Sequence, residues 1–352
     1  MNVLGALRYG FINTKIRGMK REYITMEQYN KIIEAPYQDL VKILMETVYG
    51  EALREFNETP TPIEIEKALL KSLTKSYIKV LKWLPTQAMK VIALHMMKYE
   101  IENIKSMLRL KTLNASIERL KEHITPIPLG LKIEDYVKIY EEAKSVEEAI
   151  RKLIEVEVPI PIEEIIEREI TDITLIEAYI DKAIYKAIFN EAKKLDGKSS
   201  KSIRELLGLE VDLTNIKNVL RAKKLKLDWN ETEENMITPT YKIGLQTLKR
   251  AFEKDNIEEA LREAMGKHYK ELLKQSIEAL SKAGLETLEK FFNKEIYRNY
   301  QRVWKGGFQH DLSPTLAYLT RKWIEVKNIK VIAYGKNFGL QKQKIIEELI
   351  IT

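Results

Sequence analysis

The sequence contains no cysteine, which excludes disulfides, thiolate metal sites and cysteine nucleophiles. Glycine and proline are scarce, with 14 and 10 residues in a chain of 352. Because both residues end or bend helices, their scarcity indicates long uninterrupted helices. No apolar run approaches the roughly 20 residues that a bilayer-spanning helix needs, and the first residues lack the apolar core of a signal peptide. We therefore expect a chain that does not cross a membrane.

Histidine is also rare, with four residues. His95 and His123 stand in helical sequence without a cysteine or a second histidine nearby, so we expect neither to bind a metal. His310 and Asp311 could suggest acid–base chemistry, but a loop cap before Ser313 is favoured. The sequence has no phosphate-binding glycine loop and no Gly-x-Ser-x-Gly motif. It thus predicts no catalytic residue, no cofactor and no metal site.

The charge balance is basic but mixed, with 59 basic and 52 acidic side chains and a formal net charge of +7. Lysine and glutamate alternate along most segments, which favours a solvated, ion-paired helical surface. The densest basic run, Arg221–Lys226, lacks interleaved aromatic residues. A basic helical nucleic-acid-binding protein, suggested by this run and by a pI of about 9.0, is kept as the alternative function.

Apolar residues recur with helical spacing through nearly the whole chain, as in Tyr37, Leu40, Val41 and Leu44. Thr61 followed by Pro62 is a typical helix start, so we expect a helix to begin there. These patterns predict an all-α protein.

A phrase of the form acid-x-x-Asn-Ile-Lys occurs three times, with its asparagines 112 and 113 residues apart. This period exceeds a solenoid unit of roughly 20–50 residues and matches a small domain. We predict three similar helical domains: residues 1–98, a shortened first repeat; 99–210; and 211–352, which includes a C-terminal closing helix. The polar positions of the phrase are Glu100, Asn103, Asp212, Asn215, Glu325 and Asn328.

A second landmark supports the period. Residues 145–154 resemble 256–265 and, more distantly, 36–45. The third phrase stands close to the end of the chain, so we interpret its copy as only the opening helix of a unit. Asn13 is a candidate for a worn opening copy at the other end.

Helix geometry places the acid and the asparagine of each phrase on the apolar face, whereas the lysine, and Arg109 or Arg221 beyond it, should point outward. A buried carboxylate needs partners to offset its desolvation. One hypothesis makes Glu100, Asp212 and Glu325 metal or proton-handling ligands, as in the Glu-x-x-His motif of di-iron bundles. Because the residue at i+3 is always asparagine, we favour a structural polar network.

Several segments resemble one known family. Tyr9–Met19 is similar to its Tyr-x-x-x-Asn-x-(Arg/Lys)-(Val/Ile)-Arg start, and Leu44–Gly50 to its Leu-x-x-Thr-x-Tyr-Gly motif. Asp212–Lys223 resembles its Asp-hydrophobic-x-Asn-Ile-(Lys/Arg)-x-x-(Leu/Ile)-Arg segment, and Leu316–Leu319 with Glu325–Lys330 fits its C-terminal part. The family is the C subunit of A/V-type ATP synthases, the counterpart of the d subunit in vacuolar ATPases.

This resemblance implies three helical bundles in a funnel with a pseudo-threefold axis. It also implies a non-catalytic subunit that seats the central-stalk subunits D and F on the membrane ring of proteolipid c subunits, among the other subunits of the complex. Such a subunit would lie peripherally on the cytoplasmic side of the cell membrane, with no nucleic-acid partner. The family usually has an acidic residue and a proline before Tyr318, and Ser313-Pro314 keeps only the proline.

Overall fold

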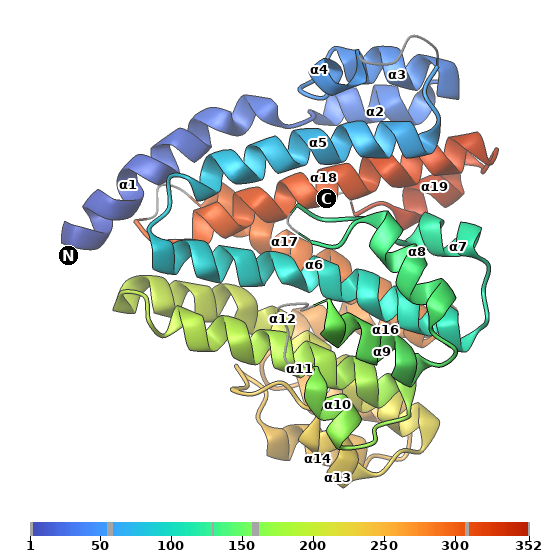
Figure 1. Ribbon diagram of the computed structural model, residues 1–352. Coiled ribbons are helices and arrows are strands. Elements are labelled where there is room, and N and C mark those ends of the chain that lie inside the picture. Colours follow the sequence, from blue (N-terminus) through green and yellow to red (C-terminus); the bar gives the residue numbers. More distant parts are fainter. Residues whose placement is uncertain (1–2, 55–58, 129, 157–161, 307–309, 351–352) are drawn as a thin grey trace. The chain divides into compact units, whose positions relative to one another are not determined.

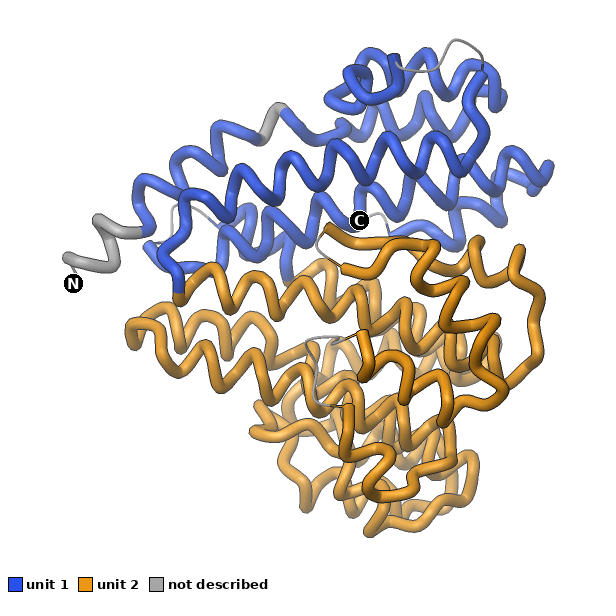
Figure 2. Tube along the Cα trace, viewed as in Figure 1, with its two compact units in different colours: residues 1–86, 300–352 blue, residues 87–299 orange. Residues whose placement is uncertain are grey.

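The computed structural model describes residues 3–54, 59–128, 130–156, 162–306 and 310–350. Over these ranges the regular structure is helical and contains no strand, which confirms the all-α prediction (Figure 1). The chain forms two compact units (Figure 2): unit 1 joins residues 1–86 to 300–352, and unit 2 comprises residues 87–299. Among the described helices, none has the length and apolar character that a bilayer crossing requires.

Unit 1 is built from both ends of the chain. Helix α18 (Ser313–Asn337) packs along α5 (Pro62–Leu81), although the two are far apart in sequence. The elements of unit 1 are α1 (Val3–Gly18), a 3-10 helix (Met19–Glu22), α2 (Met26–Glu34), α3 (Tyr37–Met45), α4 (Gly50–Leu53), α5 (Pro62–Leu81), the end of α17, α18 (Ser313–Asn337) and α19 (Lys342–Glu348).

Unit 2 contains the continuous middle of the chain. Its helices are α6 (Thr86–Thr112), α7 (Ile117–His123), α8 (Ile133–Glu142), α9 (Val146–Glu155), α10 (Glu163–Glu167), α11 (Ile173–Ala192), α12 (Gly197–Leu225), α13 (Trp229–Glu234), α14 (Leu245–Phe252), α15 (Ile257–Met265), α16 (Lys270–Ala283) and most of α17 (Leu285–Lys305). The division into three domains stays a prediction, and its boundaries after residues 98 and 210 fall inside α6 and α12.

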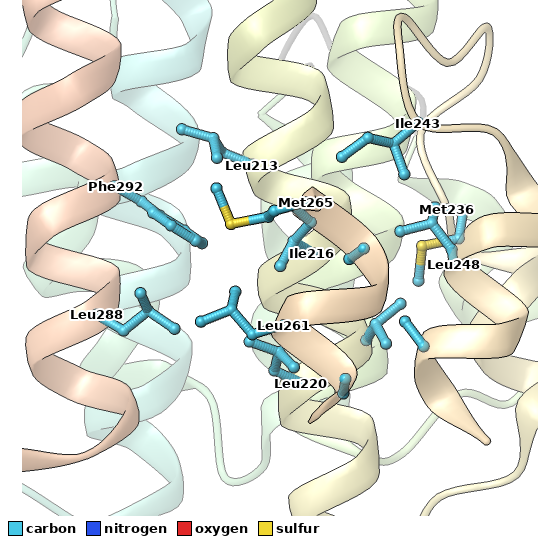
Figure 3. Close-up of a cluster of buried hydrophobic side chains, with 14 of the residues drawn as sticks. Leu213, Ile216, Leu220, Met236, Ile243, Leu248, Leu261, Met265, Leu288 and Phe292 are labelled. Carbon is cyan, nitrogen blue, oxygen red and sulfur yellow. The ribbon is translucent and has the colours of Figure 1, made fainter. Parts of the chain in front are cut away.

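A large apolar cluster in unit 2 shows how the helical spacing builds a core (Figure 3). Leu213, Ile216 and Leu220 lie on one face of α12 and are fully buried. They belong to the same cluster as Leu261 of α15 and Phe292 of α17. Each such side chain contributes about 1.5–3 kcal/mol by leaving water.

The start of α5 follows the local rules. Thr61 is its N-cap and Pro62 its first residue, which confirms the helix start predicted there. The Thr61 Oγ1 accepts the Glu64 N–H, and a Glu64 carboxylate oxygen accepts the Thr61 N–H at 2.7 Å. This reciprocal capping box satisfies two N–H groups that a helix end otherwise leaves open.

The three longest helices, α6, α12 and α18, end in the same way. Each is followed by a residue with left-handed backbone: Asn114, Lys226 and Gly339, with φ of 49°, 56° and 65°. The next residue then donates its N–H to the carbonyl five positions back, at 3.0, 3.0 and 2.8 Å. This is the hydrogen bond of a Schellman cap. In every copy the left-handed residue stands fourteen positions after the acid of the phrase, so the structural repeat extends well beyond six residues.

Candidate functional site

The six polar residues singled out in the sequence lie on these three long helices, two on each of α6, α12 and α18. All are buried. Their exposed fractions are 1% for Glu100, 4% for Asn103, 0% for Asp212 and Asn215, 5% for Glu325 and 3% for Asn328. At this depth each polar atom is costly unless it finds a hydrogen-bond partner.

The asparagine acts identically in each copy. Its Nδ2 donates to the carbonyl of the residue 22 positions further along, and its Oδ1 accepts the N–H of that same residue. The side-chain amide of each asparagine thus binds both the N–H and the carbonyl of one residue. The pairs are Asn103 with Thr125 (2.8 and 3.0 Å), Asn215 with Ile237 (3.0 and 2.8 Å) and Asn328 with Ile350 (3.1 and 2.9 Å).

The acid of each copy holds a second stretch of backbone. Asp212 accepts the N–H groups of Tyr241 (3.2 Å) and Lys242 (2.9 Å), and the Tyr269 hydroxyl donates to it at 2.7 Å. Burial raises the pKa of the Asp212 carboxyl above its ordinary value, and the tyrosine and backbone donors offset part of that rise. The Asp212 carboxylate therefore accepts hydrogen bonds from three donors. Tyr241 and Lys242 lie in the connection after α13, and Tyr269 lies directly before α16.

Glu100 occupies the same position on α6. It accepts the Leu131 N–H at 2.7 Å. A methyl group on Gly130 would lie 2.5 Å from the other carboxylate oxygen, so the close approach of backbone to carboxylate requires glycine there. Burial raises the pKa of Glu100, and the Leu131 N–H acts in the opposite direction.

Glu325 takes two of its three partners from the opposite end of the chain. The Ile24 N–H donates to it at 2.8 Å, the Tyr49 hydroxyl at 2.6 Å and the Lys322 ammonium at 3.0 Å. Tyr49 directly precedes α4, just as Tyr269 directly precedes α16. The third copy is therefore an opening helix whose remaining partners come from the N-terminal part of unit 1.

Asn13, the candidate for a worn opening copy, makes a different contact. Its Nδ2 donates to the Asp311 carbonyl at 3.0 Å, just ahead of α18. It thus ties α1 to the start of α18 within unit 1, instead of holding a backbone unit 22 residues downstream.

The expectation that the lysine of the phrase points outward is wrong for Lys105 and Lys330, and in the remaining copy Lys217 is half-buried, so that desolvation lowers its pKa. Lys105 is buried and pairs with Asp181 of α11 at 2.9 Å, and Lys330 is buried and pairs with Glu66 of α5 at 2.9 Å. The helical wheel gives the direction of a side chain relative to its own helix, but a second long helix packs against that side. A buried cation is retained there because a carboxylate faces it.

A further repeated pairing was missed in the sequence. Arg109 and Arg221, nine residues after the acid, each bind a glutamate 68 positions further along, Glu177 and Glu289. Both arginines use two nitrogens, the bidentate geometry that matches a carboxylate. In the third copy this position is Tyr334. Its hydroxyl lies 3.3 Å from Glu66.

A lysine eleven residues after each acid was also missed. Its ammonium donates to carbonyls at the C-terminal end of a short helix, where the free carbonyls and the helix dipole favour a cation. The contacts are Lys111 to Tyr140 O (2.7 Å), Lys223 to Phe252 O (3.0 Å) and Lys336 to Ile33 O (2.8 Å). Aligning the phrases past their sixth residue would have revealed this lysine. Since Arg221 and Lys223 are engaged inside the fold, the basic run favours nucleic-acid binding less than its charge suggests.

His95 and His123, which the sequence did not favour as metal ligands, lie within α6 and α7. His95 is buried, and burial together with the Lys98 ammonium holds its pKa well below the ordinary value. His123 places its Nδ1 2.8 Å from the Arg119 carbonyl of its own helix. Asp311 accepts the Ser313 N–H at 2.8 Å, which confirms the loop cap expected before α18. Within the described ranges no three histidine, aspartate or glutamate side chains converge as a metal site.

The comparisons with known proteins agree along nearly the whole chain. The family model described as ATP synthase (C/AC39) subunit matches residues 12–348. Among curated proteins, the C subunit of the A-type ATP synthase from Methanocaldococcus jannaschii is 28% identical over 99% of this chain and 88% of its own length.

Two further relatives carry the same name. The C subunit of the A-type ATP synthase from Thermococcus kodakarensis is 27% identical, and that from Pyrococcus abyssi is 25% identical. Each alignment covers 96% of this chain and 89% of the relative. Because the family model covers nearly all of the sequence, the chain belongs to the ATP synthase (C/AC39) subunit family.

Proposed function

We propose that this chain is a non-catalytic central-stalk subunit of a rotary A-type ATP synthase. In this role it would serve as a socket that couples the membrane ring of c subunits to the central shaft. The observation that carries the proposal is the family match over residues 12–348, together with relatives named as C subunits of A-type ATP synthases that align over nearly their full length. The socket could act in ion-driven ATP synthesis or in ATP-driven ion pumping.

The chemistry of the repeated polar positions supports a structural role. The Asp212 and Glu325 carboxylates each accept hydrogen bonds from three donors of the protein. The side-chain amide of each asparagine binds the N–H and the carbonyl of a single residue, as Asn215 does with Ile237. We propose that these residues fix the connections between helices. A socket that transmits torque has to be rigid. Buried polar side chains whose hydrogen bonds are satisfied make a protein rigid, and they need no catalytic activity to do so.

The proposed partners are the central-stalk subunits D and F, the c-ring at its cytoplasmic surface, and the remaining subunits of the synthase. The chain would then lie peripherally on the cytoplasmic side of the cell membrane. The three-repeat division belongs to the same proposal: residues 1–98 as a shortened first repeat, 99–210 as the second, and 211–352 as the third with a C-terminal closing helix.

The test is recovery of the complex with the tagged full chain as bait. The chain is added to detergent extracts of membranes that contain an intact A-type ATP synthase, and bound proteins are identified by mass spectrometry. We expect c subunits together with D and F, in fixed ratio to the bait. Recovery of neither ring nor shaft subunits would refute the proposal. Recovery of shaft subunits without the ring would refute the coupling role alone.

A further inference from the structure

Two arginines of unit 1 differ from the ion-paired side chains described above. Arg17 lies on α1 and Arg321 on α18. Across the residues that the structure describes, Arg17 Nε, Arg17 Nη2 and Arg321 Nε are enclosed by protein and have no hydrogen-bond partner. No described carboxylate forms an ion pair with either side chain. A guanidinium is always charged and carries five N–H donors, so enclosing it without acceptors is costly.

Aromatic rings are the neighbours of these two cations. The Arg321 Cζ lies 4.1 Å from the centroid of the Tyr23 ring and 5.6 Å from that of the Trp304 ring. The Arg17 Cζ lies 5.7 Å from the same Trp304 centroid. The face of a ring attracts a cation but offers its N–H groups no oxygen. Both guanidinium groups therefore lie beside one indole and keep donors for another acceptor.

The rings form a fixed base, whereas the arginines can be reached from solvent. The ring centroids of Tyr23, Trp304 and Tyr318 lie 5.5 to 5.9 Å from one another. All three rings are buried, but Arg17 and Arg321 are only half-buried. Among the described atoms, Arg17 Nη1 and both Nη atoms of Arg321 are not enclosed without a partner. A ligand can therefore approach these nitrogens from outside.

The chain segments that carry this cluster are poor in acids. Residues 1–21 and 297–324 contain ten lysines and arginines but only one acid, Asp311. The Asp311 carboxylate accepts the Ser313 N–H at 2.8 Å. The next acid along the chain, Glu22, accepts the Tyr318 hydroxyl at 3.1 Å and lies 3.4 Å from the Lys79 ammonium. The positive charge of the two arginines is thus left for a ligand to balance.

The repeated polar network does not account for Arg321. It stands four residues before the acid of its phrase, where the other two copies have Met96 and Gly208. The asparagine and the acid keep the same kind of partner in each copy, so the shared architecture needs no arginine at this position. Arg321 is therefore a feature of unit 1 alone.

The shape and the charge of the two cations indicate the class of ligand. The planar fork of a guanidinium matches the oxygens of a carboxylate or a phosphate. A carboxylate or a phosphodiester carries one negative charge, whereas a terminal phosphate group carries about 1.5 to 2 at pH 7. Two guanidinium groups without acids are best balanced by the terminal phosphate.

We propose that Arg17 and Arg321 bind a terminal phosphate group, supplied by inorganic phosphate or by a phosphate monoester. The phosphate oxygens accept the N–H groups that the rings leave free, while Tyr23 and Trp304 support the guanidinium groups. This site goes beyond the proposed socket function, because it needs neither the c-ring nor the shaft. It gives unit 1 a small-molecule ligand.

The experiment is calorimetric titration of the purified full chain in phosphate-free buffer at constant ionic strength. Orthophosphate and adenosine monophosphate test the two sources, and dimethyl phosphate and acetate are singly charged controls. We expect at least one of the first two to bind with a dissociation constant of about 1 mM or tighter, and both controls to bind at least about tenfold more weakly. Binding of orthophosphate alone identifies free phosphate, and binding of adenosine monophosphate identifies a monoester. No binding of either at about 10 mM, or equal binding of a control, overturns the proposal.

Variants locate the binding on these two side chains. Arg17→Gln and Arg321→Gln should each weaken binding at least about tenfold. The matched control is Arg54→Gln, which makes the same charge change at an exposed arginine of unit 1 and should weaken binding less than about twofold. Equal losses in the control and the two site variants overturn the site.

A conservative variant keeps the test valid if the glutamine variants do not fold. Arg17→Lys with Arg321→Lys preserves both charges but removes the planar forks. It should weaken binding at least about threefold, with an unchanged circular dichroism spectrum. Wild-type affinity in this double variant would overturn recognition by the guanidinium groups.

Discussion

Replacing Asn215 by alanine tests whether the repeated asparagine holds the fold together. Asn215 is fully buried, and it satisfies both the N–H and the carbonyl of Ile237, which is itself fully buried. The substitution removes both bonds and leaves two backbone groups without partners away from water. Each such group costs about 1–3 kcal/mol, so the free energy of unfolding of this region should fall by about 2–5 kcal/mol.

The control is a second asparagine on the same helix. Asn218 is 6% exposed, and its Nδ2 has no hydrogen-bond partner in the described part of the chain. Asn218→Ala makes the same chemical change three residues later without breaking a hydrogen bond of the side-chain amide. It should therefore change stability by less than about 1 kcal/mol in either direction.

The measurement combines two readouts. Urea unfolding followed by circular dichroism gives the change in the free energy of unfolding of each variant. Because the chain has two compact units, hydrogen exchange at the Ile237 amide reports the local effect independently of global unfolding. We expect Ile237 to lose protection in Asn215→Ala and to keep it in Asn218→Ala. If the two variants agree within about 0.5 kcal/mol and Ile237 stays protected in both, the asparagine does not act as we describe.

The remaining predictions address three other features. Burial raises the folded-state pKa of Glu100, so its contribution to stability is fully present below about pH 4.5 and is lost as the pH rises through the folded pKa. In urea unfolding, Glu100→Gln should therefore make the free energy of unfolding depend less on pH. An unchanged pH profile in this variant would contradict the prediction. Lys223→Met keeps the aliphatic stem but removes the cation at the Phe252 carbonyl, and should cost about 1 kcal/mol in thermal unfolding; no loss would mean that this contact is negligible. A methyl group at Gly208 would lie 2.3 Å from the Tyr241 ring, so Gly208→Ala should cost about 1–3 kcal/mol, and wild-type stability in this variant would show that the ring moves freely.

Much of the local structure could be predicted because it depends on neighbours in sequence. The helix start at Thr61 and Pro62 follows from capping and backbone restriction within four residues. The recurrence of Asn103, Asn215 and Asn328 could be read directly from the numbering. Each of these signals lies within one helix or its first turn, where geometry is nearly independent of the rest of the chain.

The partners of the same residues could not be predicted. Lys105 was expected to face solvent, and its carboxylate partner Asp181 lies on another helix. Helical angles give directions relative to one axis, whereas burial depends on which element packs against that direction. The tyrosines that bind the acids stand at different separations in sequence, as with Asp212 to Tyr269 and Glu325 to Tyr49, so no fixed spacing reveals them.

The sequence by itself determined that this protein is helical, that it repeats with a period of 112 to 113 residues, and which family it resembles. These properties follow from short-range helix preferences and from residue identity. Only the tertiary structure decided what the repeated residues hold. It showed that each asparagine binds a backbone unit 22 residues ahead, and that Glu325 near the C-terminus is completed by Ile24 and Tyr49 near the N-terminus. The physical reason is that a buried carboxylate needs donors wherever packing brings them, and packing is not limited by distance along the chain.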